Sequence, residues 1–358
     1  MQENSPRLAA ACRLVCYLTL ALLISCPAAA DSVFVEGKTI SIIVGSGTGG
    51  STDGSARLMG QFLTKHLPGA PTTVVQNRPG AHGVAALSYF AEQVKPDGLT
   101  VAVGSGSQLD PVNYRVPQSR YDPTQFAMVG GIDLGGGVVV IRTEALPRLM
   151  DKTASPVVMG APAGIPHSAM LPVAWGIDYL GWNAKWITGF PSQTPALVLA
   201  LERGEVDMTA FSVTGLTTSL LDRSKYKILY QTGSNRCTQP SSLPALQGTP
   251  IFADVIKGRI ADPLAQKAFD YWCNSASIVT WMALPPGTPA EIVNTYRAAF
   301  GRIAADPEFL EKGRIFSGDL TAASHQTVTA TVAAFGQASP DVIDFRRQML
   351  RRQGLDLH

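Results

Sequence analysis

The residues best suited to chemistry in this sequence lie in a glycine-rich turn. Gly45-Ser46-Gly47-Thr48-Gly49-Gly50 separates a β-rich run, Thr39–Val44, from a helical stretch at residues 51–67. The turn fits the pattern G-x-G-x-x-G, but a dinucleotide site would also need an acidic residue near the end of the second strand, which here reads Val75-Gln76-Asn77-Arg78. What remains is a helix start with unpaired amides, preceded by residues small enough for a ligand to touch the main chain. That arrangement is typical of an anion-binding site.

Other side chains are poorly arranged for catalysis or metal binding. The sequence has no G-x-S-x-G nucleophile elbow. Its five histidines show no H-E-x-x-H or other metal-ligand spacing; they are His66, His82, His167, His325 and His358. We therefore expect no catalytic residue, no metal and no cofactor. A Ser/His/Asp group assembled from distant positions stays open, and with it the alternative of an exported α/β hydrolase acting on a carboxylate ester.

The composition indicates a folded chain without affinity for nucleic acids. The 358 residues are 46% hydrophobic and 16% charged, which predicts enough core for about two domains. With 29 basic and 27 acidic residues, the formal net charge is +2. This balance lacks the dense positive field that sequence-independent nucleic-acid binding needs, so we expect no nucleic-acid partner.

The first thirty residues have the pattern of an export signal. Arg7 and Arg13 precede an apolar run at residues 14–26, and small residues follow it, so we expect cleavage after Ala30. The apolar run is shorter than the roughly 20 residues that a transmembrane helix needs, and no later stretch is apolar enough to span a membrane, so we expect a soluble mature protein. Leu23-Ile24-Ser25-Cys26 also looks like a lipoprotein cleavage box, although Pro27 directly after Cys26 disfavours acylation there.

Two cysteines remain after the expected cleavage, because Cys12, Cys16 and Cys26 leave with the signal. Cys237 and Cys273 form an even pair in an oxidising compartment, which permits a single disulfide and argues against a metal site. Two separate buried thiols fit the sequence equally well, so both arrangements stay open.

The mature chain alternates short apolar runs with helical stretches. Strands are expected at Thr39–Val44 and at residues 73–75, 99–103, 137–141, 157–159, 186–188, 206–210 and 227–230, and helices at 51–67, 83–94, 167–180 and 195–202. Such alternation predicts an α/β fold with mainly parallel sheets covered on both faces. Ligands of such sheets bind at the carboxyl ends of the strands, where the glycine-rich turn lies.

Five motifs, in order along the chain, carry a family resemblance. They are Gly49-Gly50-Ser51-Thr52-Asp53 with Ala56-Arg57, Gln76-Asn77-Arg78-Pro79-Gly80-Ala81, Lys95-Pro96-Asp97-Gly98-Leu99-Thr100, Ala200-Leu201-Glu202-Arg203-Gly204-Glu205-Val206-Asp207, and Leu284-Pro285-Pro286-Gly287-Thr288-Pro289-Ala290-Glu291. This series resembles the periplasmic solute-binding proteins of tripartite tricarboxylate transporters, the Bug-type receptors, over essentially the whole mature chain.

The resemblance implies a two-lobed periplasmic binding protein fold with a ligand cleft between the lobes. Lobe 1 would comprise residues 31–131 and 285–358, and lobe 2 residues 132–284, with crossing segments near Gly131 and Leu284. It also implies a monomeric periplasmic receptor, not an enzyme, that captures a small organic carboxylate or a related amide. The large and small membrane subunits of a secondary transporter would be its partners, although such receptors can also serve sensing.

The same resemblance assigns the ligand-binding residues. In lobe 1 these are Gly50, Ser51, Thr52 and Asp53 in one turn and Ser105, Gly106 and Ser107 in another. In lobe 2 they are Gly164, Ile165, Pro166, His167 and Ser168, then Phe190, Ser192, Gln193 and Thr194, and finally Phe211. Phe211-Ser212 departs from the acidic or amide residue usual in the family at that point, and His82 stands where a glycine is usual.

None of these loops contains lysine or arginine, so backbone amides and hydroxyls would have to hold a carboxylate. Hydrogen bonds to a charged group contribute about 1.5–3 kcal/mol each, and a helix N-terminus adds roughly 0.3–1 kcal/mol. Three or four such contacts plus burial of the ligand's ring or chain can reach micromolar binding after ordering costs. An uncharged amide would fit almost as well. We expect Asp53 to cap amides of the first helical turn rather than to face the ligand. Helix capping is also the alternative role for Ser51, Thr52 and His167.

Overall fold

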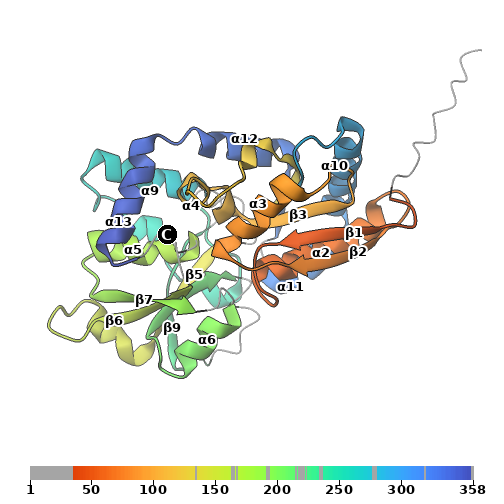
Figure 1. Cartoon of the computed structure of the whole chain (residues 1–358). Coiled ribbons are helices and arrows are strands. Elements are labelled where there is room, and N and C mark those ends of the chain that lie inside the picture. Colours follow the sequence, from red (N-terminus) through yellow and green to blue (C-terminus); the bar gives the residue numbers. More distant parts are fainter. Residues whose placement is uncertain are drawn as a thin grey trace, which may run out of the picture.

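The fold consists of two β-sheets, each with its own helices. The computed structural model describes residues 35–133, 135–162, 166, 168–190, 194–213, 216, 222, 224–233, 237–275, 280–317 and 320–355. Figure 1 shows the sheets as the centres of two adjacent bodies. The expected export signal and five of the expected site residues, Gly164, Ile165, His167, Ser192 and Gln193, lie outside the described residues.

The first sheet, sheet A, has six strands in the order β11-β4-β10-β3-β1-β2. The strands are β1 (Thr39–Val44), β2 (Thr72–Asn77), β3 (Thr100–Ser105), β4 (Ala127–Asp133), β10 (Thr280–Leu284) and β11 (Thr321–Ser324). Strand β1 pairs in parallel with β2 and β3, whereas β10 is antiparallel to β3 and β4, and β11 is antiparallel to β4.

Helices cover both faces of sheet A, which explains why β1 reads as a continuous apolar run. Ile40, Ile42 and Val44 point into one core cluster, and Ile43 points into the cluster on the opposite face. The helices around this sheet are α2 (Ser51–His66), α3 (Val84–Gln93), α4 (Pro111–Tyr114), α10 (Ala290–Ala305), α11 (Pro307–Ser317) and α12 (His325–Gly336).

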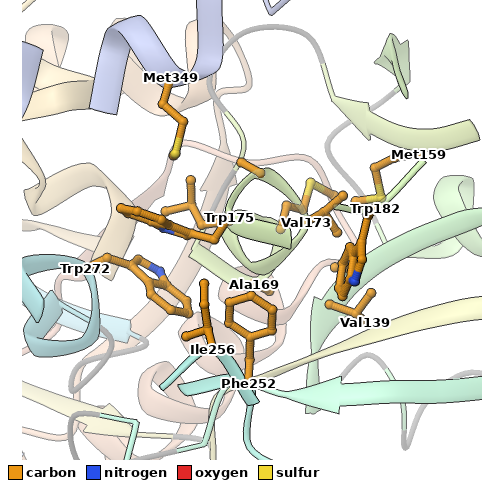
Figure 2. Close-up of a cluster of buried hydrophobic side chains, with 14 of the residues drawn as sticks. Val139, Met159, Ala169, Val173, Trp175, Trp182, Phe252, Ile256, Trp272 and Met349 are labelled. Atoms are coloured by element: carbon orange, nitrogen blue, oxygen red, sulfur yellow. The ribbon is translucent and has the colours of Figure 1, made fainter. Parts of the chain in front are cut away.

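The second sheet, sheet B, has five strands in the order β7-β6-β8-β5-β9. They are β5 (Gly137–Arg142), β6 (Val157–Pro162), β7 (Ala184–Phe190), β8 (Met208–Ser212) and β9 (Tyr226–Gln231). Its helices are α5 (Leu171–Tyr179), α6 (Thr194–Glu202), α8 (Phe252–Ile256), α9 (Pro263–Ser275) and α13 (Pro340–Arg352). Figure 2 shows the core that they form, in which Trp175, Trp272 and Met349 are buried together with Phe252.

The sheets are mixed rather than mainly parallel, which corrects the expectation from the sequence. Strands β6, β7 and β8 are parallel, but β5 runs antiparallel to β8 and β9. The chain passes directly from β4 of sheet A into β5 of sheet B, and it returns from α9 into β10. Each passage inserts a strand that is antiparallel to its neighbours, and no local sequence pattern records that direction.

The C-terminal helix α13 joins the two bodies. It packs mainly against α9 and also touches α5 and α4, and its Val342, Met349 and Leu350 belong to the core beside sheet B. The expected lobe boundaries, which assign residues 285–358 to lobe 1, stay a prediction.

A disulfide settles the question that the two remaining cysteines left open. Cys237, in the segment after β9, is bonded to Cys273 in α9, and their Cα atoms are 5.3 Å apart. Both residues are buried.

Candidate functional site

The turns after β1 and β3 meet at one edge of sheet A. Because β3, β1 and β2 are adjacent parallel strands, their carboxyl ends lie side by side. The Gly45–Gly50 turn leads from β1 into α2, and a short 3₁₀ helix, Gly106–Leu109, follows β3 directly. This edge therefore gathers the residues that the sequence analysis assigned to lobe 1.

The start of helix α2 has no side-chain cap. Its N-cap residue Gly50 is extended, with φ −81° and ψ 167°, and makes no side-chain capping bond. Ser51 and Thr52 are half-buried in the first turn. The first amides of a helix have no partner within the helix, so this end offers N–H donors to an acceptor.

Asp53 does not cap the amides of the first helical turn as we expected; it binds the residue before the N-cap instead. Its carboxylate accepts hydrogen bonds from the Gly49 amide at 3.0 Å, from Arg57 Nε at 3.0 Å and from Asn77 Nδ2 at 2.9 Å. Asn77 Nδ2 also donates to the Ser46 carbonyl, so the network ties the turn to the end of β2. Burial alone would raise the pKa of Asp53, but these hydrogen bonds outweigh it and hold the pKa below its ordinary value.

The turn after β3 is held by a capping box. The Ser105 hydroxyl and the Gln108 side chain satisfy each other's backbone amides, and Gln108 Oε1 accepts from the Ser105 amide at 2.9 Å. Trp281 Nε1 donates to the Ser105 carbonyl at 2.8 Å, and the hydroxyls of Ser105 and Ser107 are 2.8 Å apart. Since the backbone of Ser105 is engaged, the amides of Gly106 and Ser107 are the better candidates for contact with a ligand.

Gln108 is a residue that the sequence analysis missed. Its Nε2 donates to the His82 carbonyl at 3.0 Å, which links the turn after β3 to the segment after β2. Gly83 and Gly45 approach so closely here that a Cβ on Gly83 would overlap Gln108. Burial lowers the pKa of the neighbouring His82. Glutamine in a polar turn gives no local signal of such a role, because its partner is 26 residues away.

Those lobe 2 candidates that the structure describes lie at or near the carboxyl ends of β6, β7 and β8. Phe190 ends β7 and is partly buried against two core clusters, Thr194 begins α6, and Ser168 begins a 3₁₀ turn that leads into α5. Phe211 lies in β8 with only 1% of its surface exposed and belongs to a core cluster with Val198. The structure therefore places the Phe211 side chain in the core.

A small cavity shows that the two bodies face each other at these edges. Gly106, Ser107 and Asn113 line it from the side of sheet A, and Pro166 and Leu171 line it from the side of sheet B. Its free volume is about 10 Å³, and the buried Arg346 of α13 also lines it. The turn after β3 thus lies opposite the segment after β6.

The described part of the chain contains neither a metal site of clustered side chains nor a membrane-spanning helix. No group of three His, Cys, Asp or Glu side chains there is placed to hold a metal ion. Likewise, none of the helices described has both the length and the apolar character needed to cross a bilayer.

Several solved structures share this fold, and one of them is described as a periplasmic binding protein. The periplasmic binding protein BugD superimposes with a TM-score of 0.64 at 21% identity, covering 89% of this chain and 98% of its own. MatC from Rhodopseudomonas palustris with bound malate gives 0.62 at 20% identity, covering 86% and 99%. An R. palustris protein with adipate gives 0.64 at 20% identity, covering 89% and 98%. The fold is that of the two-lobed periplasmic binding proteins, as expected.

A relative found by sequence comparison agrees with these structural neighbours. A UPF0065 protein of Bordetella bronchiseptica is 25% identical over 315 residues, which are 86% of this chain and 85% of that protein. No family model matches the chain. These relatives confirm the resemblance to Bug-type receptors that the five sequence motifs indicated.

Proposed function

We propose that this protein is a periplasmic receptor that captures a small organic carboxylate, or a related amide, and delivers it to a tripartite tricarboxylate-type secondary transporter. The observation that carries the proposal is the uncapped start of α2 beside the turn after β3, opposite the segment after β6. The malate and adipate bound to two structural neighbours support a carboxylate as the solute class.

In lobe 1, main-chain amides near Ser51, Thr52, Gly106 and Ser107 would donate hydrogen bonds to the solute. The hydroxyls of the serines and the threonine would add further hydrogen bonds. Asp53 would repel an anion if its charge were unbalanced, but Arg57 contacts both of its carboxylate oxygens. Three or four hydrogen bonds to an anion, at about 1.5–3 kcal/mol each, together with burial of the ligand's ring or chain, can reach micromolar affinity after ordering costs. The segments after β6 and β7, with Pro166, Ser168 and Thr194, would complete the site from lobe 2.

The two bodies around sheets A and B are the proposed lobes. A solute that touches both would favour their closed arrangement, because only that arrangement allows all of its contacts. The closed form would then dock on the large and small membrane subunits. We also propose that the protein is exported, with the signal cleaved after Ala30, and that it is a receptor rather than an enzyme.

Thermal-shift measurements with aliphatic dicarboxylates, aromatic carboxylates and their amides test the function. A solute at a hundredfold excess over its Kd stabilises the protein by about 2.7 kcal/mol. We expect a saturable shift and recovery of the unaltered compound. Turnover of the compound would support the hydrolase alternative instead.

A variant tests the site. Replacing Ser51 and Thr52 with leucine should abolish the shift, because the larger side chains cover the amides, while the unliganded protein still melts cooperatively. Gln61→Leu is the matched control, since Gln61 is an exposed position of the same helix. Retained affinity in the double variant would place the site elsewhere.

A further inference from the structure

A buried ion pair joins the C-terminal helix to the turn after β3. Arg346 in α13 donates through Nη1 to Asp110 Oδ2 at 2.7 Å, and the two residues are 1% and 4% exposed. Asp110 directly follows the Gly106–Leu109 helix, and it is 236 positions before Arg346 in the sequence. The pair therefore connects a helix packed beside sheet B to a turn of sheet A.

Asp110 is the point on which several elements converge. Its Oδ1 accepts from the Val112 amide at 3.0 Å and from the Tyr271 hydroxyl of α9 at 3.2 Å. Its own amide donates to the Ser107 carbonyl at 3.2 Å, and Asn113 Nδ2 donates to the same carbonyl at 2.6 Å. Any displacement of Asp110 would therefore be passed to Ser107, three residues before it.

The small cavity lies between this pair and the candidate site. Arg346 and Asp110 line it together with Gly106 and Ser107, and Arg346 Nε is buried without a partner among the described residues. A free volume of about 10 Å³ holds at most about one water molecule. The guanidinium thus supports the far side of the turn whose amides are candidates for the solute.

We propose that Arg346 is a positioning residue of the solute site, which acts through Asp110 to hold the Gly106 and Ser107 amides in the orientation that binds the solute. This inference rests on the proposed function. Removal of Arg346 leaves a buried carboxylate without its counter-charge, and such a group moves toward water or takes up a proton. Either response would weaken the contacts through which Asp110 holds the Gly106–Leu109 turn.

Arg346→Gln tests the proposal, with Arg352→Gln as the matched control. Arg352 lies on the same helix but pairs at 3.1 Å with Asp178 of α5, at an exposed place away from the turn. In the unliganded protein, hydrogen exchange of the amides from Gly106 to Asp110 should become faster in Arg346→Gln and stay unchanged in Arg352→Gln. The Kd of the solute found in the thermal-shift screen should rise about 2- to 30-fold in Arg346→Gln only.

Two further variants separate positioning from general stability. Arg346→Lys keeps the charge beside Asp110 and should recover part of the affinity. If Arg346→Gln does not fold, Tyr271→Phe removes one hydrogen bond to Asp110 and should change exchange and Kd in the same direction by less. A lower melting temperature with unchanged exchange in the turn and unchanged Kd would overturn the proposal. If the unaltered protein binds no carboxylate or amide, the proposed function fails, and the exchange result still decides whether Arg346 holds the turn.

Discussion

Removal of the disulfide should lower the unfolding free energy of the protein by an amount set by the length of the loop that the bond closes. The bond spans 36 positions of sequence, from Cys237 to Cys273. This loop contains α8 and most of α9, which supply Phe252, Ile256 and Trp272 to the core beside sheet B. Closing a loop of that length removes unfolded-chain entropy equivalent to about 4 kcal/mol at 25 °C.

Urea unfolding of the oxidised protein, the reduced protein and Cys237→Ala/Cys273→Ala measures this contribution. Alanine avoids placing hydroxyls at two buried positions. The reduced protein and the double variant should each lose about 4 kcal/mol of unfolding free energy relative to the oxidised protein. Dithiothreitol should leave the double variant unchanged, which controls for other effects of the reductant.

The reasoning would be refuted by a reduced protein as stable as the oxidised one. An independent test denatures the protein without reductant and then adds an alkylating reagent. Alkylation of both Cys237 and Cys273 would show that no bond had formed. A loss much smaller than expected, with the bond present, would mean that the loop stays compact in the unfolded chain.

Two further predictions concern sheet A. Gly104→Ala should destabilise the protein by about 1–3 kcal/mol, because the added Cβ would overlap the Trp281 indole. Gly301→Ala should instead stabilise it, because this position of α10 faces open space and alanine favours a helix more than glycine does. Differential scanning calorimetry compares the two variants. Asp53 has a folded-state pKa below 3.8, so its contribution to stability is present above that value and is lost as pH falls through the folded pKa. Below about pH 4, the unfolding free energy of Asp53→Asn should therefore fall less steeply with decreasing pH than that of the unaltered protein. Equal slopes in the two proteins would contradict this role of Asp53.

Local signals in the sequence were enough to predict most strands and the class of fold. The expected strand Thr39–Val44 has the observed bounds, because an apolar run between a charged residue and a glycine-rich turn specifies both ends. The uncapped start of α2 was also predictable, since glycine before a helix supplies no capping side chain. The strand directions were not, because they depend on where the chain crosses between sheets.

The residues that hold the turns of the candidate site in place could not be predicted from the sequence, because their partners are distant along the chain. Gln108 acts on His82, and Asp110 acts with Arg346, so each depends on a partner that the fold brings close and the sequence keeps distant. Arg346 in particular reads as a polar position on an amphipathic helix rich in arginine. Only its burial in the folded chain distinguishes it from Arg351 and Arg352.

Two arginines beside the candidate site would explain how the proposed anion receptor can work without a cation in its binding loops. Arg57 is committed to Asp53, and Arg346 is committed to Asp110. Each pair is close to neutral as a unit, so neither attracts an anion strongly, and both hold turns whose amides remain as donors. Amides discriminate by the direction of their hydrogen bonds more than by the ligand's net charge. Selectivity in this site would then depend on how firmly the two ion pairs fix those turns, which makes the residues behind the amides as important as the amides themselves.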